Sequence, residues 1–426
     1  MFTVTDFKNR HEKLLSIVKE KYPEIKSGAI LLFGNFEQEA VKFKQESSFY
    51  YFTGINEPAS ALLINFDGNS TLFVPNCGPT RIHWVSGCID PNICKPNDIG
   101  FDELKYLGEQ AKGYELYPFF SKEEYSHLLN EIQKIINNSG KIFTLNPNNQ
   151  RQYFEQRFIL NRLNSFLPQL ESSISDISAI VAQMRRAKSK REIEALYKAI
   201  EITVMGHEAA MQIMAPEKYE NEVQAGIEFV FTASNANLAF PSIVGSGKNS
   251  TVLHYTANNN KINKGDLVVV DIGAQYEHYC GDITRTYPAS GKFNKRQKEI
   301  YEIVLETQEY IAQIAKPGLW LSNKQNPDQS LNHLAREFIK ERGYDKYFLH
   351  GIGHFLGLDV HDVGDYLEPL QKGDVITIEP GIYIADENIG VRIEDNYWIV
   401  DDGNICLSEQ LPKTVKEIEE LLKKEK

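Results

Sequence analysis

The chain has 426 residues, of which 42% are hydrophobic and 24% charged, the proportions of an ordinary globular protein with a large core. At roughly 150 residues per domain, this length favours two or three domains. The chain carries 46 Lys and Arg residues against 58 Asp and Glu residues, which gives a formal net charge of −12. Such an acidic balance argues against a nucleic-acid partner, because gripping a phosphate backbone requires positive charge.

Cysteine usage and hydropathy indicate a cytoplasmic protein without membrane attachment. The five cysteines are an odd number and form no Cys-x-x-Cys pair, so we expect free thiols in a reducing compartment. Residues 1–20 lack the apolar core of a signal peptide. The longest apolar runs are far shorter than the roughly 20 residues that a membrane helix needs.

The first part of the chain alternates short strand-like runs with helical ones. The apolar runs 29–33, 61–64 and 71–74 are typical of buried strands, and residues 123–136 are typical of a helix. This alternation predicts an α/β domain, which we place at residues 1–172.

The second domain is expected at residues 173–426 and contains a long helix near its start. Ser189 and Glu192 have the spacing of a capping box, and a helical apolar period follows them. The members of that apolar period are Ile193, Leu196, Tyr197, Ile200 and Val204. Residues 415–426 predict a charged C-terminal helix that faces solvent.

An internal repeat is the most informative feature of the second domain. Residues 264–273 read KGDLVVVDIG, and residues 372–381 read KGDVITIEPG. In both, a Lys-Gly-Asp turn is followed by a β-rich run, an acid, one residue and a glycine. We infer two similar half-domains that face each other across a cleft, with Asp271 in one half corresponding to Glu379 in the other.

Four acids are expected at this cleft: Asp271, Asp282, Glu379 and Glu394. Asp271 and Glu379 end buried strands, where an unpaired charge is expensive. Asp282 and Glu394 each follow after a turn, which can bring them back to the first acid of their half. Four converging carboxylates repel one another unless a cation lies between them, and two divalent metal ions would neutralise the set.

Histidines are concentrated in the same region. His350, His354 and His361 lie in the glycine-rich stretch HGIGHFLGLDVHD, and His254 precedes Asp271 at nearly the spacing by which His361 precedes Glu379. One imidazole added to four carboxylates gives a mainly oxygen-donor site for two metal ions. Such donors suit Mn²⁺, with Co²⁺ and Zn²⁺ as alternatives. The two ions would share a water molecule and lower its pKa.

Other catalytic motifs are incomplete or absent in the sequence. The stretch around GSGKN at residues 245–249 lacks two residues that a phosphate-binding loop requires, because Ser242 replaces the first glycine and Asn249 replaces Ser or Thr. The sequence contains no HExxH, GxSxG or zinc-finger spacing.

Five motifs in order resemble the metallopeptidases of the pita-bread fold, the group of methionine aminopeptidase, prolidase and aminopeptidase P. These motifs are GSGKNSTVLHY, VVVDIGAQYEHYCGDITRTYP, HGIGHFLGLDVHD, TIEPGIY and GVRIEDN. Residues 43–58, FKQESSFYYFTGINEP, resemble the N-terminal domain of aminopeptidase P. The resemblance implies an α/β (α+β) protein, with a creatinase-like N-terminal domain followed by a pita-bread catalytic domain with an internal pseudo-twofold repeat.

The resemblance also implies roles for the site residues. It assigns five metal ligands: Asp271, Asp282, His354, Glu379 and Glu394. Asp282 and Glu394 would bridge both metals, Asp271 would bind one, and His354 with Glu379 would hold the other. The resemblance places His254, His350 and His361 on the substrate side, with Arg392 and Tyr383 as a supporting pair.

The implied activity is hydrolysis of the bond between an N-terminal residue and a following proline, as in aminopeptidase P. Glu379 would move the proton of the nucleophile, and His361 and His254 would stabilise the developing oxyanion and the proline side. Prolidase, which is restricted to dipeptides, is the alternative within the fold. A dipeptidase needs a cation for the proline carboxylate, and neither Arg285 nor Arg392 is an obvious candidate.

A binding module that has lost catalysis is the alternative of another class, but all five ligand positions hold ligand-competent residues. The expected partners are peptides with proline at the second position, and the resemblance implies a homodimer or homotetramer. Trp84, in RIHWVSG, is expected either at an interface or cleft or, with equal weight, in the core of its own domain.

Overall fold

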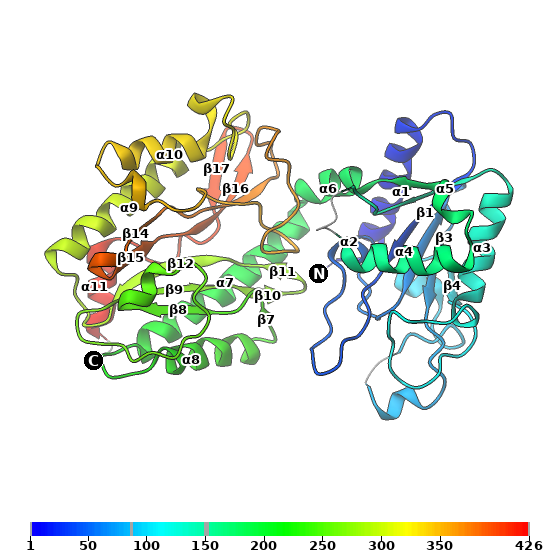
Figure 1. The fold of residues 1–426 in the computed structure, drawn as a ribbon, viewed down its shortest axis with the longest axis horizontal. Helices are drawn as coiled ribbons and strands as arrows, with labels where there is room; N and C mark the ends of the chain where they lie inside the picture. Colours follow the sequence, from blue (N-terminus) through cyan, green and yellow to red (C-terminus); the bar gives the residue numbers. More distant parts are fainter. Residues whose placement is uncertain (1, 86–87, 149–152, 425–426) are drawn as a thin grey trace. The chain divides into compact units, whose positions relative to one another are not determined.

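The computed structural model describes residues 2–85, 88–148 and 153–424. The chain forms two compact units, Met1–Arg185 and Arg186–Lys426 (Figure 1). This division lies later in the chain than the expected boundary at residues 172 and 173. Strand β6 (Ile174–Asp176) pairs in parallel with β5 (Lys141–Thr144), and this pairing ties the intervening residues to the first unit.

The first unit is a mixed sheet with helices on both faces. Its six strands have the order β4-β3-β2-β1-β5-β6. The elements before β5 are α1 (Val4–Lys21), β1 (Gly28–Phe33), α2 (Ser47–Thr53), β2 (Ala61–Asn65), β3 (Ser70–Val74), the 3₁₀ helices η1 (Arg81–His83) and η2 (Pro96–Ile99), β4 (Glu103–Tyr106), η3 (Glu123–Tyr125) and α3 (Ser126–Asn137). After β5 come α4 (Phe154–Phe166), α5 (Leu170–Ser173), β6 and α6 (Ser178–Arg186).

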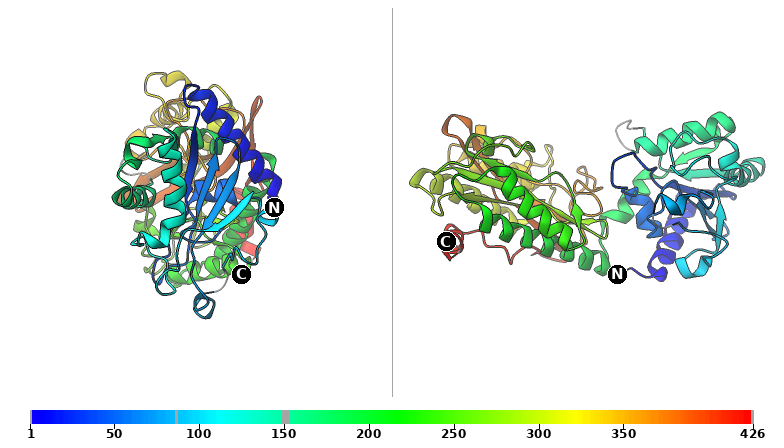
Figure 2. Two further views of the ribbon diagram at one scale, coloured as in Figure 1. Left: turned by 90° about the vertical axis from the view of Figure 1, so that its right-hand side faces the viewer. Right: turned by 90° about the horizontal axis from the view of Figure 1, so that it is seen from below.

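Alternation along β1 explains why this sheet is covered on both sides. Ala29, Leu31 and Phe33 join the hydrophobic cluster formed with α3 and α4. Ile30 and Leu32 are equally buried but point to the opposite face, because successive side chains of a strand alternate. Helix α1 covers that opposite face (Figure 2). The runs predicted as strands are therefore β1, β2 and β3, and the predicted helix is η3 followed by α3.

Trp84 is not a core residue of the first unit. Its side chain is 66% exposed and stacks on Tyr114, with the ring centroids 4.6 Å apart. The interpretation of Trp84 as a packed core residue is therefore wrong. All five cysteines are free thiols in this structure. In the described part of the chain, no helix combines the length and the apolar character needed to span a membrane.

The second unit begins with two long helices and continues as two half-sheets. The first half contains α7 (Lys190–Ile213), α8 (Glu220–Ala233), β7 (Asn237–Leu238), β8 (Ile243–Ser246), η4 (Gly247–Thr251), β9 (Leu267–Ile272), β10 (Ala274–Tyr276), β11 (Tyr279–Cys280) and β12 (Ile283–Pro288). The second half contains α9 (Lys295–Ile314), η5 (Pro327–Gln329), α10 (Leu331–Lys340), η6 (Asp345–Tyr347), β13 (Val375–Ile378), β14 (Gly381–Ile384), η7 (Ala385–Glu387), β15 (Ile389–Arg392), β16 (Asp395–Val400), β17 (Gly403–Cys406) and α11 (Val415–Lys424).

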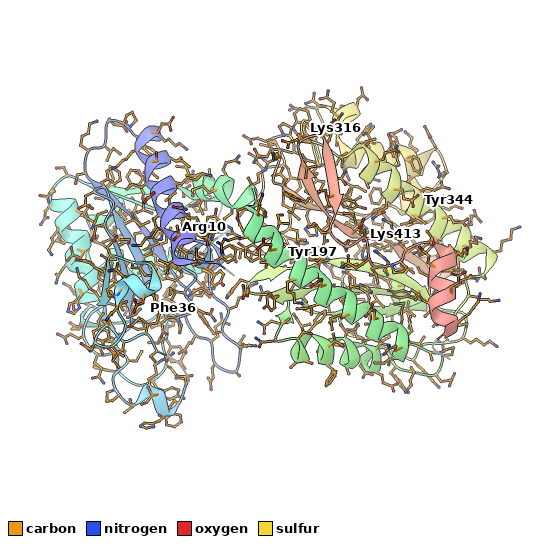
Figure 3. All side chains as sticks on the ribbon, turned by 180° about the vertical axis from the view of Figure 1, so that it is seen from behind. Arg10, Phe36, Tyr197, Lys316, Tyr344 and Lys413 are labelled. Carbon is orange, nitrogen blue, oxygen red and sulfur yellow. The ribbon has the colours of Figure 1, made fainter. Side chains whose placement is uncertain are left out.

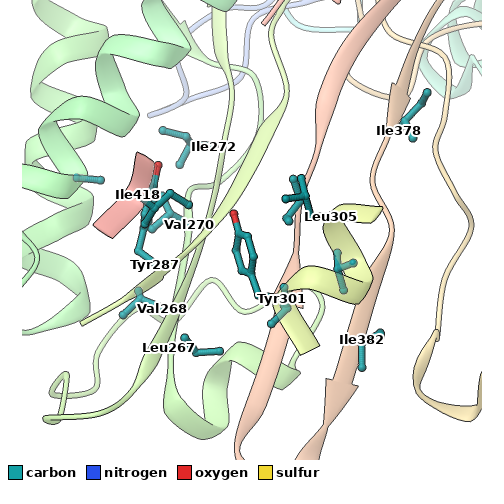
Figure 4. Close-up of a cluster of buried hydrophobic side chains, with 14 of the residues drawn as sticks. Leu267, Val268, Val270, Ile272, Tyr287, Tyr301, Leu305, Ile378, Ile382 and Ile418 are labelled. Atoms are coloured by element: carbon teal, nitrogen blue, oxygen red, sulfur yellow. The ribbon is translucent and has the colours of Figure 1, made fainter. Parts of the chain in front are cut away.

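Helices pack on the outer side of both half-sheets. Helices α7 and α8 contact the β12-β9-β8 sheet, and α9 contacts β13, β14, β15 and β17. One hydrophobic cluster joins the two halves, with Val270 of β9, Tyr301 of α9 and Ile378 of β13 among its members (Figure 4). Because both half-sheets pack on this core, the core fixes their positions relative to each other. It therefore also fixes the ends of β9 and β13.

The internal repeat of the sequence is also a repeat of backbone conformation. Gly265 and Gly373 adopt the same left-handed conformation, with φ of +91° and +95°, which a residue with a side chain rarely adopts. The aspartate after each glycine accepts a hydrogen bond from a backbone N–H three residues before it, at 2.8 Å for Asp266 and 2.9 Å for Asp374. Strands β9 and β13 start directly after these turns. The same turn chemistry therefore sets the start of both site-bearing strands.

Two predicted helices are present, with differences in detail. Helix α7 starts at the predicted capping box of Ser189 and Glu192. Tyr197, however, is 43% exposed and lies outside the buried stripe of that helix (Figure 3). Helix α11 is not a wholly solvated helix, because Ile418 and Leu422 pack into the shared core. The high charge of its sequence hides this apolar stripe.

A buried ion network holds the second half-sheet to its surroundings. Asp395, at the start of β16, is fully buried and accepts hydrogen bonds from Arg285 at 2.7 Å, Lys413 at 2.9 Å, Gln308 at 2.7 Å and Ser408 at 2.7 Å. Burial opposes ionisation, but the two cations hold the pKa of this carboxyl below its usual range. Because Asp395 bonds to β12, α9 and the segment before α11, it couples the halves of the unit.

We expect Asp395→Ala to destabilise the second unit by about 3–5 kcal/mol, because the change leaves the Arg285 guanidinium buried without its counter-ion. Denaturant unfolding followed by tryptophan fluorescence measures this change. Asp401→Ala is the control, since Asp401 forms an exposed ion pair with Lys372 and should have no measurable effect. Equal stability of both variants would show that the buried network contributes nothing.

Candidate metal centre

The first half of the second unit contributes two carboxylates. Asp271 is the fifth residue of β9, whose antiparallel neighbours are β8 and β12, and it lies opposite Ile243 on one side and Thr284 on the other. Asp282 directly precedes β12 and is buried. The β9–β12 pairing returns the chain to the same end of the sheet, as the sequence predicted for this pair of acids.

The second half contributes the remaining three predicted ligands. Glu379 directly follows β13, and Glu394 lies between β15 and β16. His354 lies in a loop that pairs with β13, since its N–H donates to the Thr377 hydroxyl at 3.1 Å and its carbonyl accepts from the Thr377 N–H at 2.9 Å. A side chain at Gly353 would collide with the Thr377 carbonyl, which explains the glycine beside this histidine.

Four of the five predicted ligands lie close to one another. Asp282, His354 and Glu394 each offer a ligand atom within 4.8 Å of the other two. The Nε2 atom of His354 lies 3.3 Å from an Asp282 oxygen and 3.7 Å from a Glu379 oxygen. Its Nδ1 lies 3.0 Å from the Phe355 carbonyl, a contact that assigns the Nδ1 proton and leaves Nε2 as the ligating nitrogen.

Without a metal ion, the negative charges of the site outnumber its positive charges. Burial and the neighbouring acids Asp271 and Asp282 raise the pKa of Glu379 to about 7, with His354 and Arg392 acting in the opposite sense. Burial also raises the pKa of Asp282 to about 6 and that of Glu394 well above its usual range. Burial lowers the pKa of His354, but Asp282 outweighs it and raises the value to about 9.

These residues fit divalent metal ions. One buried oxygen of Asp271, Oδ1, has no hydrogen-bond partner in the structure, as a ligand atom directed at a cation would have. Carboxylates with raised pKa values clustered around an imidazole are also what a missing cation leaves behind. The donor set of four carboxylates and one imidazole is suited to a divalent ion with a preference for oxygen.

Arg392 and Tyr383 hold two residues of the site in place through hydrogen bonds. The Arg392 guanidinium donates to Asp271 at 2.6 Å and to the Tyr383 hydroxyl at 2.8 Å. The same hydroxyl lies 2.8 Å from Nε2 of His350. Arg392 therefore fixes one oxygen of Asp271, and Tyr383 fixes the ring of His350.

Two supporting residues were not predicted from the sequence. The hydroxyl of Thr284 donates to Glu394 at 2.7 Å and accepts from Arg392 at 3.2 Å, and the side-chain amide of Asn396 bonds to the backbone of Asp282. Thr284 lies two residues after Asp282 and opposite Asp271 in the ladder. Side chains two residues apart on a strand point to the same face, so this spacing could have predicted that Thr284 lies beside the acids. Nothing in the sequence around Asn396 indicated its contact with Asp282.

A cavity of about 580 Å³ opens over the ligands. Its lining includes all five predicted ligands, the three predicted substrate-side histidines and Arg392, whereas Tyr383 is not part of the lining. Apolar and aromatic side chains complete the wall, namely Phe240, Pro241, Ile243, Leu253, Val360 and Tyr366. His361 contacts His354 edge to face, with ring centroids 4.2 Å apart. The site therefore combines a polar floor with an apolar wall.

Comparison with known proteins identifies the family. Residues 194–401 match metallopeptidase family M24, and residues 7–113 match the N-terminal domain of aminopeptidase P. An Xaa-Pro aminopeptidase of Haemophilus influenzae is 33% identical over 430 residues, which cover 93% of each chain. An Xaa-Pro dipeptidase of Pyrococcus furiosus is 34% identical over 397 residues, which cover 89% of this chain and 98% of that protein.

The solved structures agree with the sequence relatives. Escherichia coli aminopeptidase P with the inhibitor Pro-Leu matches with a TM-score of 0.82 and 28% identity, covering 100% of this chain and 99% of that one. The fold predicted from the resemblance, an aminopeptidase P-type N-terminal domain followed by a pita-bread domain, is therefore confirmed. The chain belongs to metallopeptidase family M24 and is a hydrolase of that family.

Proposed function

We propose that this chain is an Xaa-Pro aminopeptidase, which releases the N-terminal residue from peptides with proline at the second position. The observation that carries the proposal is the convergence of Asp271, Asp282, His354, Glu379 and Glu394 on the floor of one cavity. The aminopeptidase P-type N-terminal domain and the similarity to Xaa-Pro aminopeptidases over nearly the whole chain support it.

The cofactor in this proposal is a pair of divalent ions, with Mn²⁺ favoured by the oxygen-rich donor set. Asp282 and Glu394 would bridge the pair, Asp271 would bind one ion, and His354 with Glu379 would bind the other. The closeness of Asp282 and Glu394 to each other and to His354, with ligand atoms within 4.8 Å, is compatible with this division. When bound, such a pair supplies an activated water molecule and polarises a carbonyl group.

Glu379 is the residue proposed to move protons. Its carboxylate lines the cavity beside the other predicted ligands, 3.7 Å from Nε2 of His354, where it is placed to accept a proton from a water molecule held at the metal centre. Proton transfer from the attacking water to the departing proline nitrogen requires such a group, because the nitrogen leaves as an amine only after it has gained a proton.

The substrate-side histidines are proposed to act as neutral hydrogen-bond donors. Burial and the neighbouring His354 lower the pKa of His361, and burial and Arg392 lower that of His350 to about 4. Both rings are therefore neutral near pH 7 and can donate one N–H to an oxyanion or to a substrate carbonyl. His254, which also lines the cavity, is proposed to contact the substrate as well.

The engagement of both arginines favours an aminopeptidase over a dipeptidase. A dipeptidase must bind the carboxylate of proline itself, for which arginine is the natural partner. Arg392 is committed to Asp271 and Tyr383, and Arg285 is buried against Asp395. Among the described residues lining the cavity, Arg392 is the single arginine and lysine is absent. A peptide that continues beyond proline needs no such cation.

Further parts of the interpretation stay predictions. A binding module without catalysis is disfavoured because all five ligand positions hold residues that can bind a metal. Assembly as a homodimer or homotetramer and the cytoplasmic location also stay predictions.

We expect metal binding at pH 7.5 to release protons, since His354, whose pKa is raised to about 9, and Glu394, whose pKa is raised above its usual range, bind a metal ion only in their deprotonated forms. These raised pKa values also mean that metal affinity falls as the pH falls from 8 to 6. Calorimetric titration with Mn²⁺ in two buffers of different ionisation enthalpy measures the proton release. Binding without proton release would contradict the electrostatic description of the site.

Glu394→Gln and His361→Ala should separate the metal site from the substrate side. A neutral amide cannot bridge two cations, so Glu394→Gln should lose most of its metal and reduce kcat by at least about a hundredfold. His361→Ala should keep the metal and still slow turnover, by about a hundred- to a thousandfold. Metal analysis with steady-state kinetics checks both. Loss of metal from His361→Ala would reassign the histidine ligand.

Substrate length tests the choice between the two activities. We expect X-Pro-Y tripeptides and longer X-Pro peptides to be cleaved, with X-Pro dipeptides cut more slowly, because the described residues that line the cavity include no free cation for a terminal carboxylate. The measurement is kcat/KM for matched di-, tri- and pentapeptides with added Mn²⁺. Cleavage of the dipeptide alone would support prolidase instead.

A further inference from the structure

His254 depends on its own backbone for its position. It lies between η4 and β9, in the segment that lines the cavity with Leu253, His254 and Thr256. Among the residues that the structure describes, no side chain forms a hydrogen bond with the His254 ring. His350 differs, because the Tyr383 hydroxyl holds its ring. The contacts that hold the backbone of residues 247–260 in place therefore also set the position of His254.

Glu220 ties together both flanks of this segment. Its carboxylate is fully buried. One oxygen accepts hydrogen bonds from the N–H of Ser246 at 2.8 Å, from the hydroxyl of Ser246 at 2.7 Å and from the Asn249 amide at 3.2 Å. The other oxygen accepts from the Tyr255 hydroxyl at 2.8 Å and the N–H of Asn260 at 2.9 Å. The donors precede and follow His254 along the chain.

Electrostatic effects strengthen the hydrogen bonds that the Glu220 carboxylate accepts. The five donors are all neutral, so dipoles and not a counter-ion stabilise the buried charge, and hydrogen bonds to a charged acceptor are stronger than those to a neutral one. Glu220 is also the first residue of α8, where the helix dipole favours a negative charge. A neutral side chain at this position would hold the segment more weakly.

Glu220 is not required to cap its own helix. The carboxylate of Glu222 accepts the N–H of Tyr219 at 2.7 Å and completes the capping box of α8. Three of the five hydrogen bonds of Glu220 therefore come from residues 247–260, the segment that carries His254, and the other two come from Ser246 at the end of β8, directly before it.

A second buried side chain fixes the same segment to α8. Asn258 has a positive φ of 43° and is fully buried. Its side chain accepts from the N–H of Val244 at 3.0 Å and donates to the Ser242 carbonyl at 2.7 Å and to Gln224 at 3.0 Å. Gln224 and Glu220 both belong to α8. The segment is therefore fastened to one rigid helix at several points.

We propose that Glu220 is a positioning residue for His254, which it holds in the wall of the cavity through Tyr255 and the backbone of Asn260. This inference rests on the proposed function, in which His254 contacts the peptide. Displacement of such a group by about 1 Å can reduce a rate by about a hundredfold, even when the metal site is intact.

A double-mutant cycle with Glu220→Gln and His254→Ala tests the proposal. The metal ligands are untouched, so Glu220→Gln should keep the wild-type metal content and lower kcat/KM for an X-Pro-Y tripeptide by about ten- to a hundredfold. In the His254→Ala background the same change should alter kcat/KM by less than about twofold, since the group that it positions is already absent. Equal losses in both backgrounds, or no loss in the wild-type background, would overturn the proposal.

Two further variants complete the experiment. Tyr255→Phe removes one donor and leaves the carboxylate, so it should give a smaller loss that again disappears in the His254→Ala background. It keeps the cycle available if Glu220→Gln does not fold. Glu201→Gln is the matched control, because Glu201 pairs with Lys198 at the surface and should leave both kinetics and metal content unchanged.

Hydrogen–deuterium exchange separates this proposal from the proposed function. Glu220→Gln should accelerate exchange in residues 247–260 and leave residues 350–362 unchanged, whether or not the protein cleaves X-Pro peptides. Absence of X-Pro cleavage by the wild-type protein would defeat the proposed function alone. Unchanged exchange in residues 247–260 of Glu220→Gln would defeat the role of Glu220 alone.

Discussion

The placement of four carboxylates around one cavity is the constraint on which the rest of the second unit depends. Asp271, Asp282, Glu379 and Glu394 line the floor of one cavity. Without a cation, burial and the neighbouring acids raise the pKa values of Asp282, Glu379 and Glu394, which is a cost that folding must overcome. Arg392 offsets part of this charge at Asp271, and the shared core of the unit resists the remaining repulsion.

The repeat explains how one chain can bring these acids together. Two similar turns, at Gly265 and Gly373, start two similar strands, and each strand delivers an acid at its far end. The second acid of each half then follows from an adjoining strand. A rigid core joins the halves, so the acids are held in place before any metal binds. Such preorganisation favours catalysis, because the site needs little rearrangement during reaction.

Much of this site could be predicted from the sequence, because its parts are local. Asp271 and Glu379 end apolar runs. The glycines beside His354 indicate that another part of the backbone comes close to that loop. Residues whose role depends on distant partners carried less signal. Asn396 supports Asp282, and Glu220 supports the His254 segment, through contacts that join separate elements. The apolar stripe of α11 and the exposure of Trp84 were missed for the same reason, since burial depends on neighbours that periodicity does not name.

The central claim is that these five side chains hold two metal ions at once. The most direct measurement is anomalous X-ray diffraction at the manganese edge from crystals of the Mn²⁺-loaded protein. The account predicts two anomalous peaks about 3.5–4 Å apart, with Asp282 and Glu394 between them. No peak, or a single peak at full occupancy bound by His354 and Glu379 alone, would contradict it.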